Sequence, residues 1–318
     1  MSAGDPTPAL EHLRSVAAPP PLPGAGDTAR LWELLATVAS ADLAAARAVE
    51  PHFDAAAILA QAGQPWEPGS VWGVYAAESG QSRLSAAQDG GAWLLDGEKP
   101  WCSLAGQADR AVVTAHVDGG RRAFAVDLRQ DGVDVRAGTW NAHGLPGVPS
   151  GPVGFSSVAA SPVGATDWYL RRDGFAWGGM GVAACWFGGA VGLFRTLARA
   201  AERRTPDQLA LAWLGESDRL LAGGAAALAA AADAVDAGTA GWLEGHRVRG
   251  QIADVCSRIL AICGEALGPA PLAFDEDHAR RVADLTLYVR QHHGARDDAS
   301  LGGLVLEAGQ RNGELGTW

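Results

Sequence analysis

One stretch of the chain brings together two side chains that suit a planar, polar ligand. It reads LDGEKPWCSLAGQADRAVVTA (residues 95–115), with Trp101 and Ser103 at a small-residue corner between two strand-like runs. Side chains two positions apart on an extended chain point to the same face, so a flat indole stands beside a hydrogen-bond donor. In the alternative interpretation, Trp101 is a core aromatic and Ser103 is a turn hydroxyl.

The composition limits the classes of function. The 318 residues are 48% hydrophobic and 19% charged, as in a folded protein of two or three packed units, and the formal net charge is -11. An acidic chain has no global basic field, so we expect no nucleic-acid partner. We find no apolar run of the roughly 18 residues that span a bilayer, which predicts a cytoplasmic protein without a membrane partner.

The four cysteines do not form a metal-binding pattern. They show no C-x-x-C spacing and no cluster with histidines at metal-ligand spacing, so we expect no metal site. Cys256 and Cys263 lie seven positions apart on one side of an expected helix. Buried thiols are common in such places, and core packing is the interpretation we adopt for both.

The pattern of apolar residues changes from helical to strand-like and back. A proline-rich arm precedes Thr28, and two helices interrupted at Pro51 extend to Gly63. Short β-branched runs fill residues 66–162, and helices are expected near 174–203, 206–237, 242–266 and 276–293. We predict an α+β protein with N-terminal helices (1–66), a central antiparallel β-domain of sandwich or barrel form (67–162), and a C-terminal four-helix bundle (163–318).

This order of elements, together with the stretch GEKPWCSLAGQADRAVVTA, resembles the acyl-CoA dehydrogenase superfamily. That family has the same three-part order, its FAD lies between β-domain and bundle, and its motif reads G-x-K-x-W-I-T-N followed by A-D-x-x-V-V-x-A. The likeness covers roughly residues 28–295 and is close only in the β-domain. It implies that Trp101 packs against the flavin ring and that Ser103 donates to the N5 and O4 edge of the flavin, in place of the family's threonine.

The resemblance implies further cofactor contacts just before the motif. Ala76 and Ala77, in VYAAES, stand where the family has a T-E-P strand, and their backbone would lie beside the flavin. Glu78 matches the family's acid, and we expect it to be structural. The threonine and the following glycine-serine loop of the family are missing here, and the N-terminal helical domain is about half the usual length.

In the bundle, the family's two FAD loops are replaced by weaker counterparts. Arg203 or Arg204, in ERRTPDQLAL, stands for the R-x-x-F-G segment that reaches the FAD of a neighbouring subunit. The alternative is a solvated surface arginine. Gly268, in GEALGPAPLA, either marks the loop that cups the partner's adenosine or caps a helix.

The family's catalytic glutamate has no counterpart. The first bundle helix carries no Asp or Glu between Asp173 and Glu202, and the second family position falls on His292, followed by His293 and Gly294. Three interpretations remain open. His292, with His293 in reserve, is a general base, because the unperturbed imidazole pKa of about 6.5 suits neutral pH. Alternatively, the histidine belongs to a flavin monooxygenase of this fold, or the pair caps a helix end.

Three functions follow from the resemblance. The leading prediction is an FAD-dependent, acyl-CoA dehydrogenase-like oxidoreductase that acts on a CoA-bound or carrier-bound acyl substrate. The alternatives are a flavin monooxygenase on the same fold, and a non-catalytic subunit that completes the site of a partner dehydrogenase. Because family members share FAD between subunits, we also expect a homo-oligomer or a hetero-oligomer with a related subunit.

Overall fold

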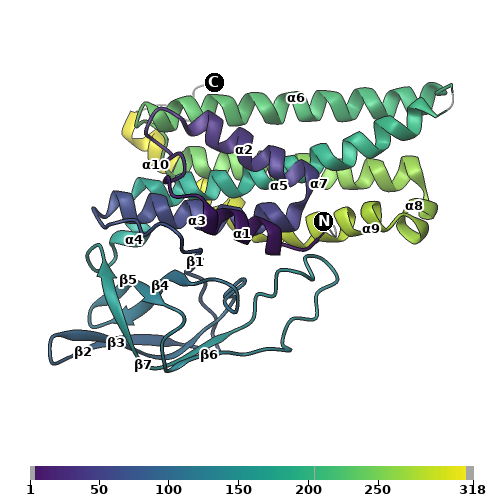
Figure 1. The fold of residues 1–318 in the computed structure, drawn as a ribbon. Coiled ribbons are helices and arrows are strands. Elements are labelled where there is room, and N and C mark those ends of the chain that lie inside the picture. Colours follow the sequence, from purple (N-terminus) through teal and green to yellow (C-terminus); the bar gives the residue numbers. More distant parts are fainter. Residues whose placement is uncertain (1–3, 204, 313–318) are drawn as a thin grey trace. The chain divides into compact units, whose positions relative to one another are not determined.

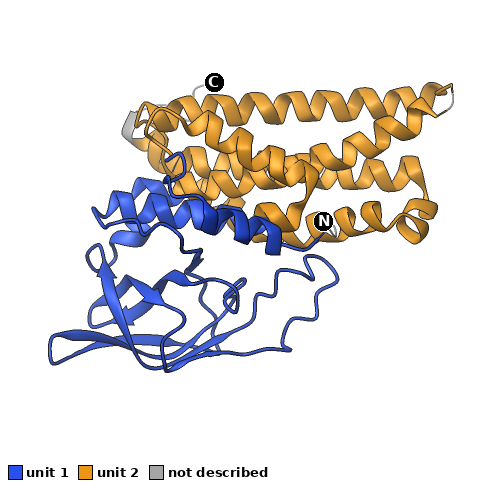
Figure 2. Ribbon diagram, in the orientation of Figure 1, with its two compact units in different colours: residues 1–22, 47–175 blue, residues 23–46, 176–318 orange. Residues whose placement is uncertain are grey.

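The structure is a computed structural model that describes residues 4–203 and 205–312. The chain forms two compact units, one of residues 1–22 and 47–175 and the other of residues 23–46 and 176–318 (Figure 2). These units group the chain differently from the three segments expected from the sequence. The strands share a unit with residues 47–66, which we assigned to the N-terminal helices, and with residues 163–175, which we assigned to the bundle.

The first unit is built on a seven-stranded sheet (Figure 1). Its strands follow the order β1-β4-β2-β3-β7-β5, with β6 beside β7, and a further pairing of β4 with β5 closes five of them into a ring. The predicted β-domain of barrel form is confirmed, although β1 and β2 each pair with β4 in parallel. The strands are β1 (Trp72–Tyr75), β2 (Leu84–Asp89), β3 (Ala92–Lys99), β4 (Arg110–Val117), β5 (Gly120–Asp127), β6 (Val133–Val135) and β7 (Val153–Val163).

Helix α3 (Leu43–Gln61) covers part of this sheet and closes the core of the first unit. Ile58 and Leu59 of α3 are buried in one cluster with Trp72 of β1, Val112 of β4 and Tyr169 of the short helix α4 (Trp168–Arg171). Burying large apolar side chains from helix and strand together is the main stabilising contribution to such a unit. The core therefore fixes α3 against β1 and β4, and β4 is the strand that follows the GEKPWCS corner.

The proline-rich arm contains a helix that we did not predict. Helix α1 (Thr7–Ser15) starts directly after Pro6 and buries Leu10 and Leu13. Proline is tolerated at the start of a helix because the first amide groups have no intrahelical partner. The Arg14 guanidinium then pairs with Asp109 at 3.0 Å, which ties the arm to the start of β4.

The break between the two N-terminal helices lies at Asp42, so the predicted interruption at Pro51 is wrong. Helix α2 (Thr28–Ala41) ends there, and the Asp42 carboxylate accepts hydrogen bonds from the amides of Ala44 and Ala45 at 2.8 and 3.1 Å. An aspartate that caps free amides is a helix start signal. Pro51 lies inside α3, where packing of the surrounding residues outweighs the missing amide.

The second unit is the predicted helical bundle with additional helices. Its four principal helices match the predicted ones within a few residues, except that the last ends at Tyr288 and continues as a short 3-10 turn. Helix α2 packs beside α6, and α10 packs on α7. The elements are α5 (Asp173–Glu202), α6 (Gln208–Asp236), α7 (Trp242–Leu267), α8 (Pro269–Phe274), α9 (Glu276–Tyr288), η1 (Val289–Gln291) and α10 (Ala295–Asn312).

Helix α5 is the apolar centre of the bundle. It is long and apolar enough to cross a membrane by length and composition alone, contrary to our reading of the sequence, and 67% of its most apolar window is buried. Its small residues allow close approach, since a Cβ on Gly188 would collide with the Ala36 carbonyl of α2. Such burial is typical of a core helix.

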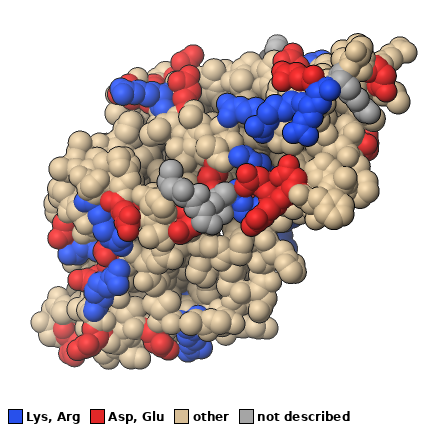
Figure 3. Space-filling model, turned by 45° about the vertical axis from the view of Figure 1, so that its right-hand side comes forward, with Lys and Arg blue, Asp and Glu red and all other residues tan. Residues whose placement is uncertain are grey.

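Charged side chains are mixed on the surface rather than separated by sign. Basic and acidic side chains are interspersed on the face in Figure 3. In the bundle, for example, Arg258 pairs with Glu216 at 2.7 Å and Arg280 pairs with Asp42 at 3.1 Å. Local pairing of this kind neutralises much of the arginine charge.

Candidate functional site

The glycine of the GEKPWCS stretch is explained by a local irregularity of the sheet. Gly97 has a φ of 119°, and the pairing of β3 with β7 shifts register between Leu95 and Gly97. A Cβ at Gly97 would collide with the Arg83 carbonyl, so glycine is the residue that fits this bulge. Strand β3 ends two residues after this bulge, at Lys99, and the corner begins there.

A buried lysine with an acidic partner holds the start of the corner. Lys99, the only lysine in the chain, is 1% exposed, and its Nζ donates to Glu78 Oε1 at 2.6 Å and to Thr114 Oγ1 at 2.9 Å. Burial raises the pKa of Glu78, but the hydrogen bond and charge of Lys99 outweigh it and leave that pKa below its usual value. Glu78 also contacts the His116 ring and the Arg121 guanidinium, at 3.2 Å each, so its carboxylate is fixed by three neighbouring side chains.

Trp101 presents its indole at the rim of the corner. The residue is 59% exposed, although tryptophan usually buries most of its surface, and its backbone is left-handed with φ 58°. A left-handed backbone costs about 1 kcal/mol for a residue other than glycine, and such strain concentrates at functional sites. The ring meets Trp140 edge to face, with centroids 6.3 Å apart. The exposed indole face offers stacking area to a planar ligand.

The hydroxyl of Ser103 is held inside the corner by two side chains. Arg47 of α3 donates from Nη2 to Ser103 Oγ at 2.9 Å, and Ser150 Oγ lies 2.7 Å from the same oxygen. The backbone is fixed as well, because the Tyr75 hydroxyl donates to the Ser103 carbonyl at 3.1 Å. Sequence analysis missed Arg47, since it lies 56 residues away and follows an unremarkable helical pattern.

Ala76 and Ala77 directly follow Tyr75, the last residue of β1. Tyr75 ends β1 and its side-chain hydroxyl reaches the Ser103 carbonyl, so the two alanines follow a residue that is tied to the corner. Ala76 is half-buried, Ala77 is exposed, and the Ala76 carbonyl accepts a long hydrogen bond of 3.5 Å from Thr114. The first unit therefore brings together Ala76, Trp101 and Ser103 in one region.

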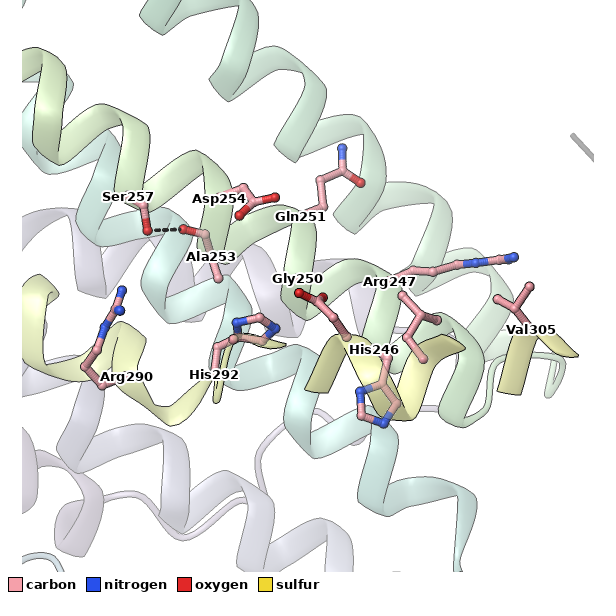
Figure 4. Close-up of a pocket in the computed structure, with 13 residues that line it drawn as sticks. His246, Arg247, Gly250, Gln251, Ala253, Asp254, Ser257, Arg290, His292 and Val305 are labelled. Carbon is pink, nitrogen blue, oxygen red and sulfur yellow. Dashed lines mark hydrogen bonds between the residues drawn. The ribbon is translucent and has the colours of Figure 1, made fainter. Parts of the chain in front are cut away.

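The second unit contains a separate pocket of about 860 Å³. Helix α7, the segment after η1 and helix α10 supply its walls, and His292 and His246 are among the side chains in Figure 4. The volume is within the range of small-molecule sites. Its lining is mixed: His246, Arg247, Gly250, Gln251, Ala253, Asp254, Ser257, Arg290, His292, Gly294, Asp298, Leu301 and Val305.

The two candidate histidines occupy different environments. The His292 side chain is 10% exposed and lines the pocket, with Nε2 at 3.8 Å from Asp297 Oδ2. The His293 side chain is 60% exposed, and its Nδ1 lies 3.2 Å from Asp297 Oδ1. Burial raises the pKa of Asp297, but hydrogen bonds from His293 outweigh it, and the net pKa is lowered. Asp297 thus stays anionic between the two rings.

The expected capping role is taken by the backbone rather than the imidazoles. The His292 amide donates to the Val289 carbonyl at the end of η1, and the His293 amide donates to Asp297 at the start of α10. Both ring contacts go to the Asp297 carboxylate. Sequence analysis missed Asp297 because its role depends on the turn at Gly294, which has a φ of 57°.

An arginine that sequence analysis also missed fixes the segment carrying His292. Arg249 of α7 donates to the Gln291 carbonyl at 2.9 Å and to the Gly179 carbonyl at 2.8 Å, and its guanidinium lies 4.7 Å from the centre of the Trp186 ring. Burial lowers the pKa of the neighbouring His246, with the Asp297 carboxylate opposing. The pocket is therefore formed by α7 as much as by the predicted histidine segment.

Residues 72–158 match the family profile described as acyl-CoA dehydrogenase, middle domain. The structure of KijD3 in complex with FMN and dTDP-3-amino-2,3,6-trideoxy-4-keto-3-methyl-D-glucose is similar over 98% of this chain and 88% of that chain, with a TM-score of 0.80 and 20% identity. No curated protein sequence matches the chain.

Two further solved structures share the fold. TdsC from Paenibacillus sp. A11-2, with FMN and indole, is 21% identical and has a TM-score of 0.75, covering 88% of this chain and 84% of that chain. Glutaryl-CoA dehydrogenase from Mycobacterium smegmatis is 17% identical with a TM-score of 0.73, covering 89% and 88%. The chain has the acyl-CoA dehydrogenase fold. The predicted resemblance to that superfamily is confirmed.

The remaining predicted contacts of the acyl-CoA dehydrogenase fold lie in the second unit. Arg203 is exposed just after α5, and Arg204 lies outside the described residues. Gly268 joins α7 to α8 with φ 67° and ψ -164°, a conformation that glycine adopts almost alone. Its amide donates to the Gly264 carbonyl at 3.2 Å, so Gly268 caps α7, the second of its two expected roles. An adenosine contact there stays a prediction.

Proposed function

We propose that this protein is a flavin-dependent monooxygenase that uses FMN and acts on a small molecule. The observation that carries the proposal is the exposed, left-handed Trp101 beside the fixed hydroxyl of Ser103. An aromatic face and a hydrogen-bond donor are what a flavin ring with polar edge atoms requires. An indole that is mostly exposed and held at a backbone cost contributes less to folding than a buried one, so the arrangement favours a ligand.

The corner is held in place from two sides, which supports its role in the proposed flavin site. Lys99 and Glu78 hold the corner from the barrel side, and the Leu104 amide donates to the Pro149 carbonyl at 2.8 Å from the loop side. Pre-organised groups bind with less loss of conformational entropy. When bound and reduced, a flavin supplies two electrons to O₂, so that one oxygen atom enters the substrate and the other leaves as water.

The choice of FMN over the predicted FAD is supported by the bundle. FAD differs from FMN by its adenosine half, and the segment aligned with the family's adenosine loop is here the cap at Gly268 followed by helix α8. The KijD3 and TdsC complexes contain FMN. FMN needs only the ring and one phosphate to be bound, which a chain with weakened FAD loops can provide.

Oxygenation is supported over dehydrogenation by the missing carboxylate. The dehydrogenase reaction needs a base of suitable strength on the thioester α-proton. Helix α5 has no Asp or Glu between Asp173 and Glu202, and the residue at the second family position is His292, which lines the pocket of the bundle. In this proposal His292 Nε2 accepts a proton from the substrate, and Asp297 stabilises the resulting imidazolium.

A second candidate is the acyl-CoA dehydrogenase-like oxidoreductase predicted from the sequence. The match of residues 72–158 to the middle domain of that family favours it. In that case His292 removes the α-proton of an acyl thioester, FAD accepts the electrons, and the protein works as an oligomer that shares its cofactor.

One experiment separates these functions. The purified chain is titrated with FMN and FAD, and flavin fluorescence gives both dissociation constants. The flavin-loaded protein is then mixed without oxygen with glutaryl-CoA, and separately with reduced FMN, O₂ and a panel of indole, dibenzothiophene and a dTDP-amino sugar. We expect tighter binding of FMN, no bleaching by the thioester, and an oxygenated product from the panel.

Other outcomes assign the chain differently. Bleaching of the flavin band by the thioester supports the dehydrogenase. No binding of either flavin removes both enzyme functions and supports the third prediction, a subunit that completes a partner's site.

A further inference from the structure

We propose that Arg47 and Ser150 are positioning residues that control the proton of the Ser103 hydroxyl, so that Ser103 meets a bound ligand as a hydrogen-bond donor. The proposal rests on the proposed flavin role of the corner and adds two residues to it. It comes from three consecutive hydrogen bonds, two at Ser103 Oγ and one from Ser150 Oγ to the Val148 carbonyl, and from the chemistry of their donors and acceptors.

Arg47 fills one lone pair of Ser103. Its Nη2 donates to Ser103 Oγ at 2.9 Å, while Nη1 lies 3.2 Å from Glu50 Oε2. The side chains of Arg47 and Glu50 are only 13% and 9% exposed, so the guanidinium is held in place. A guanidinium carries donors alone and keeps its charge at all ordinary pH values. The Ser103 proton therefore cannot point toward Arg47.

Ser150 takes that proton when the corner holds no ligand. Its Oγ lies 2.7 Å from Ser103 Oγ and donates to the Val148 carbonyl at 3.1 Å. A carbonyl only accepts, so the Ser150 proton satisfies Val148 and Ser150 accepts the proton of Ser103. In this series each group donates to the next: Arg47 to Ser103, Ser103 to Ser150, and Ser150 to the Val148 carbonyl.

A ligand that accepts a hydrogen bond competes with Ser150 for the same proton. The Ser103 hydroxyl then turns to the ligand, while Arg47 still occupies one lone pair and keeps the oxygen in place. The charge of Arg47 also polarises the hydroxyl and strengthens it as a donor. The two neighbours therefore have opposite effects, since Arg47 supports donation to the ligand and Ser150 opposes it.

The experiment is a set of double-mutant cycles on FMN binding. Dissociation constants for FMN are measured by flavin fluorescence for the parent, Ser103→Ala, Arg47→Met and Ser150→Ala, and for the two double variants that contain Ser103→Ala. Arg14→Met is the matched control, because Arg14 pairs with Asp109 in the same unit and has no contact with Ser103 among the described hydrogen bonds. Thermal unfolding confirms that each variant is folded.

We expect Ser103→Ala to weaken FMN binding about tenfold, as for loss of one hydrogen bond with a charged neighbour. Arg47→Met weakens it about fivefold and Ser150→Ala tightens it about threefold, and both effects disappear in the Ser103→Ala background. Arg14→Met leaves the affinity unchanged.

The proposal is overturned if Arg47→Met and Ser150→Ala both weaken binding, or if either effect persists without the Ser103 hydroxyl, since both results describe general loosening of the corner. Should Arg47→Met fail to fold, the sign of the Ser150→Ala effect decides. If the parent protein binds no flavin, the proposed function is refuted, and this inference with it. The titration of the parent alone identifies that outcome, before any variant is compared.

Discussion

The corner of the β-domain and the pocket of the bundle differ in how firmly their polar groups are held. In the corner, the Ser103 hydroxyl has side-chain partners at 2.9 and 2.7 Å, and the Ser103 carbonyl accepts a hydrogen bond from the Tyr75 hydroxyl at 3.1 Å. In the pocket, His292 faces Asp297 at 3.8 Å, beyond hydrogen-bond range. A tightly bonded hydroxyl selects a ligand of fixed shape, whereas a loosely held imidazole in about 860 Å³ tolerates variation in its ligand.

The comparison suggests a division of labour within this fold. A cofactor is the same in every turnover, so rigid groups that match it are favourable. A substrate has to enter, react and leave, and the side chain that exchanges a proton with it has to approach at the right moment. Under the proposed function, the corner serves the flavin and His292 serves the substrate.

The largest expected effect comes from the pocket. Replacing His292 by Ala lowers turnover of the substrate found in the panel by on the order of a hundredfold or more, the usual scale for a lost general base, and leaves FMN affinity unchanged. His293→Ala is the matched control, because its ring is 60% exposed and lies outside the lining of the pocket. Steady-state kinetics measure both. Equal losses in the two variants would contradict the assignment and point instead to their shared contact with Asp297.

In the corner, the indole is expected to contribute more than the hydroxyl. Trp101→Gly removes the stacking surface and weakens FMN binding by on the order of fiftyfold. Because glycine adopts the left-handed backbone freely, the free energy of unfolding stays the same or rises by up to about 1 kcal/mol. Fluorescence titration and urea unfolding measure the two quantities. A large loss of stability would mean that Trp101 is a packing residue, as in the alternative interpretation of the sequence.

The sequence predicted the parts of both regions that depend on local pattern. Strand periodicity located the corner, and the missing glutamate led to His292. The expectation that Trp101 and Ser103 share one face of an extended chain is wrong, because the Trp101 backbone is left-handed, with φ 58°. The indole is therefore exposed, while Ser103 is buried. Arg47 and Arg249 were missed because nothing in a helical pattern indicates which distant carbonyl or hydroxyl a long side chain will reach. The error at Pro51 has the opposite cause: tertiary packing overrode a local rule, and the cap at Asp42 was overlooked.

Acid is expected to destabilise the first unit through His52. His52 is 5% exposed, and its Nδ1 accepts the Trp72 amide of β1 at 3.2 Å. Burial lowers the pKa of His52 to about 4, against an unfolded value of about 6.5. The folded protein therefore binds fewer protons than the unfolded chain between these values, so stability is complete above about pH 6.5 and falls as the pH decreases toward 4.

The expected loss from His52 is about 2 kcal/mol between pH 7 and pH 5. Urea unfolding at both pH values measures it. His52→Gln retains an acceptor for Trp72 but does not titrate, and we expect it to reduce the pH dependence by that amount. FMN affinity should fall together with stability, since β1 leads from Trp72 to the Tyr75 hydroxyl that holds Ser103. A parent and variant with the same pH dependence would assign the acid sensitivity to other groups.

The smallest expected effect tests the tolerance of the pocket directly, with one added methyl group. A Cβ on Gly250 of α7 would lie 3.7 Å from His292 Nε2, an ordinary van der Waals distance, whereas a Cβ on Gly151 at the corner would lie 2.6 Å from Thr139 Oγ1. Gly250→Ala should therefore change turnover by less than about twofold and stabilise the protein by up to about 1 kcal/mol, because alanine favours the helix over glycine. Gly151→Ala forces the loop away from the corner, where the Gly151 carbonyl accepts a hydrogen bond from the Cys102 amide at 2.9 Å. The FMN affinity of Gly151→Ala should therefore fall by a larger factor than the turnover of Gly250→Ala. FMN titration, steady-state kinetics and urea unfolding are measured for both variants. If Gly250→Ala loses activity while Gly151→Ala binds FMN normally, the pocket is the rigid region and the corner the adaptable one, which is the opposite of our expectation.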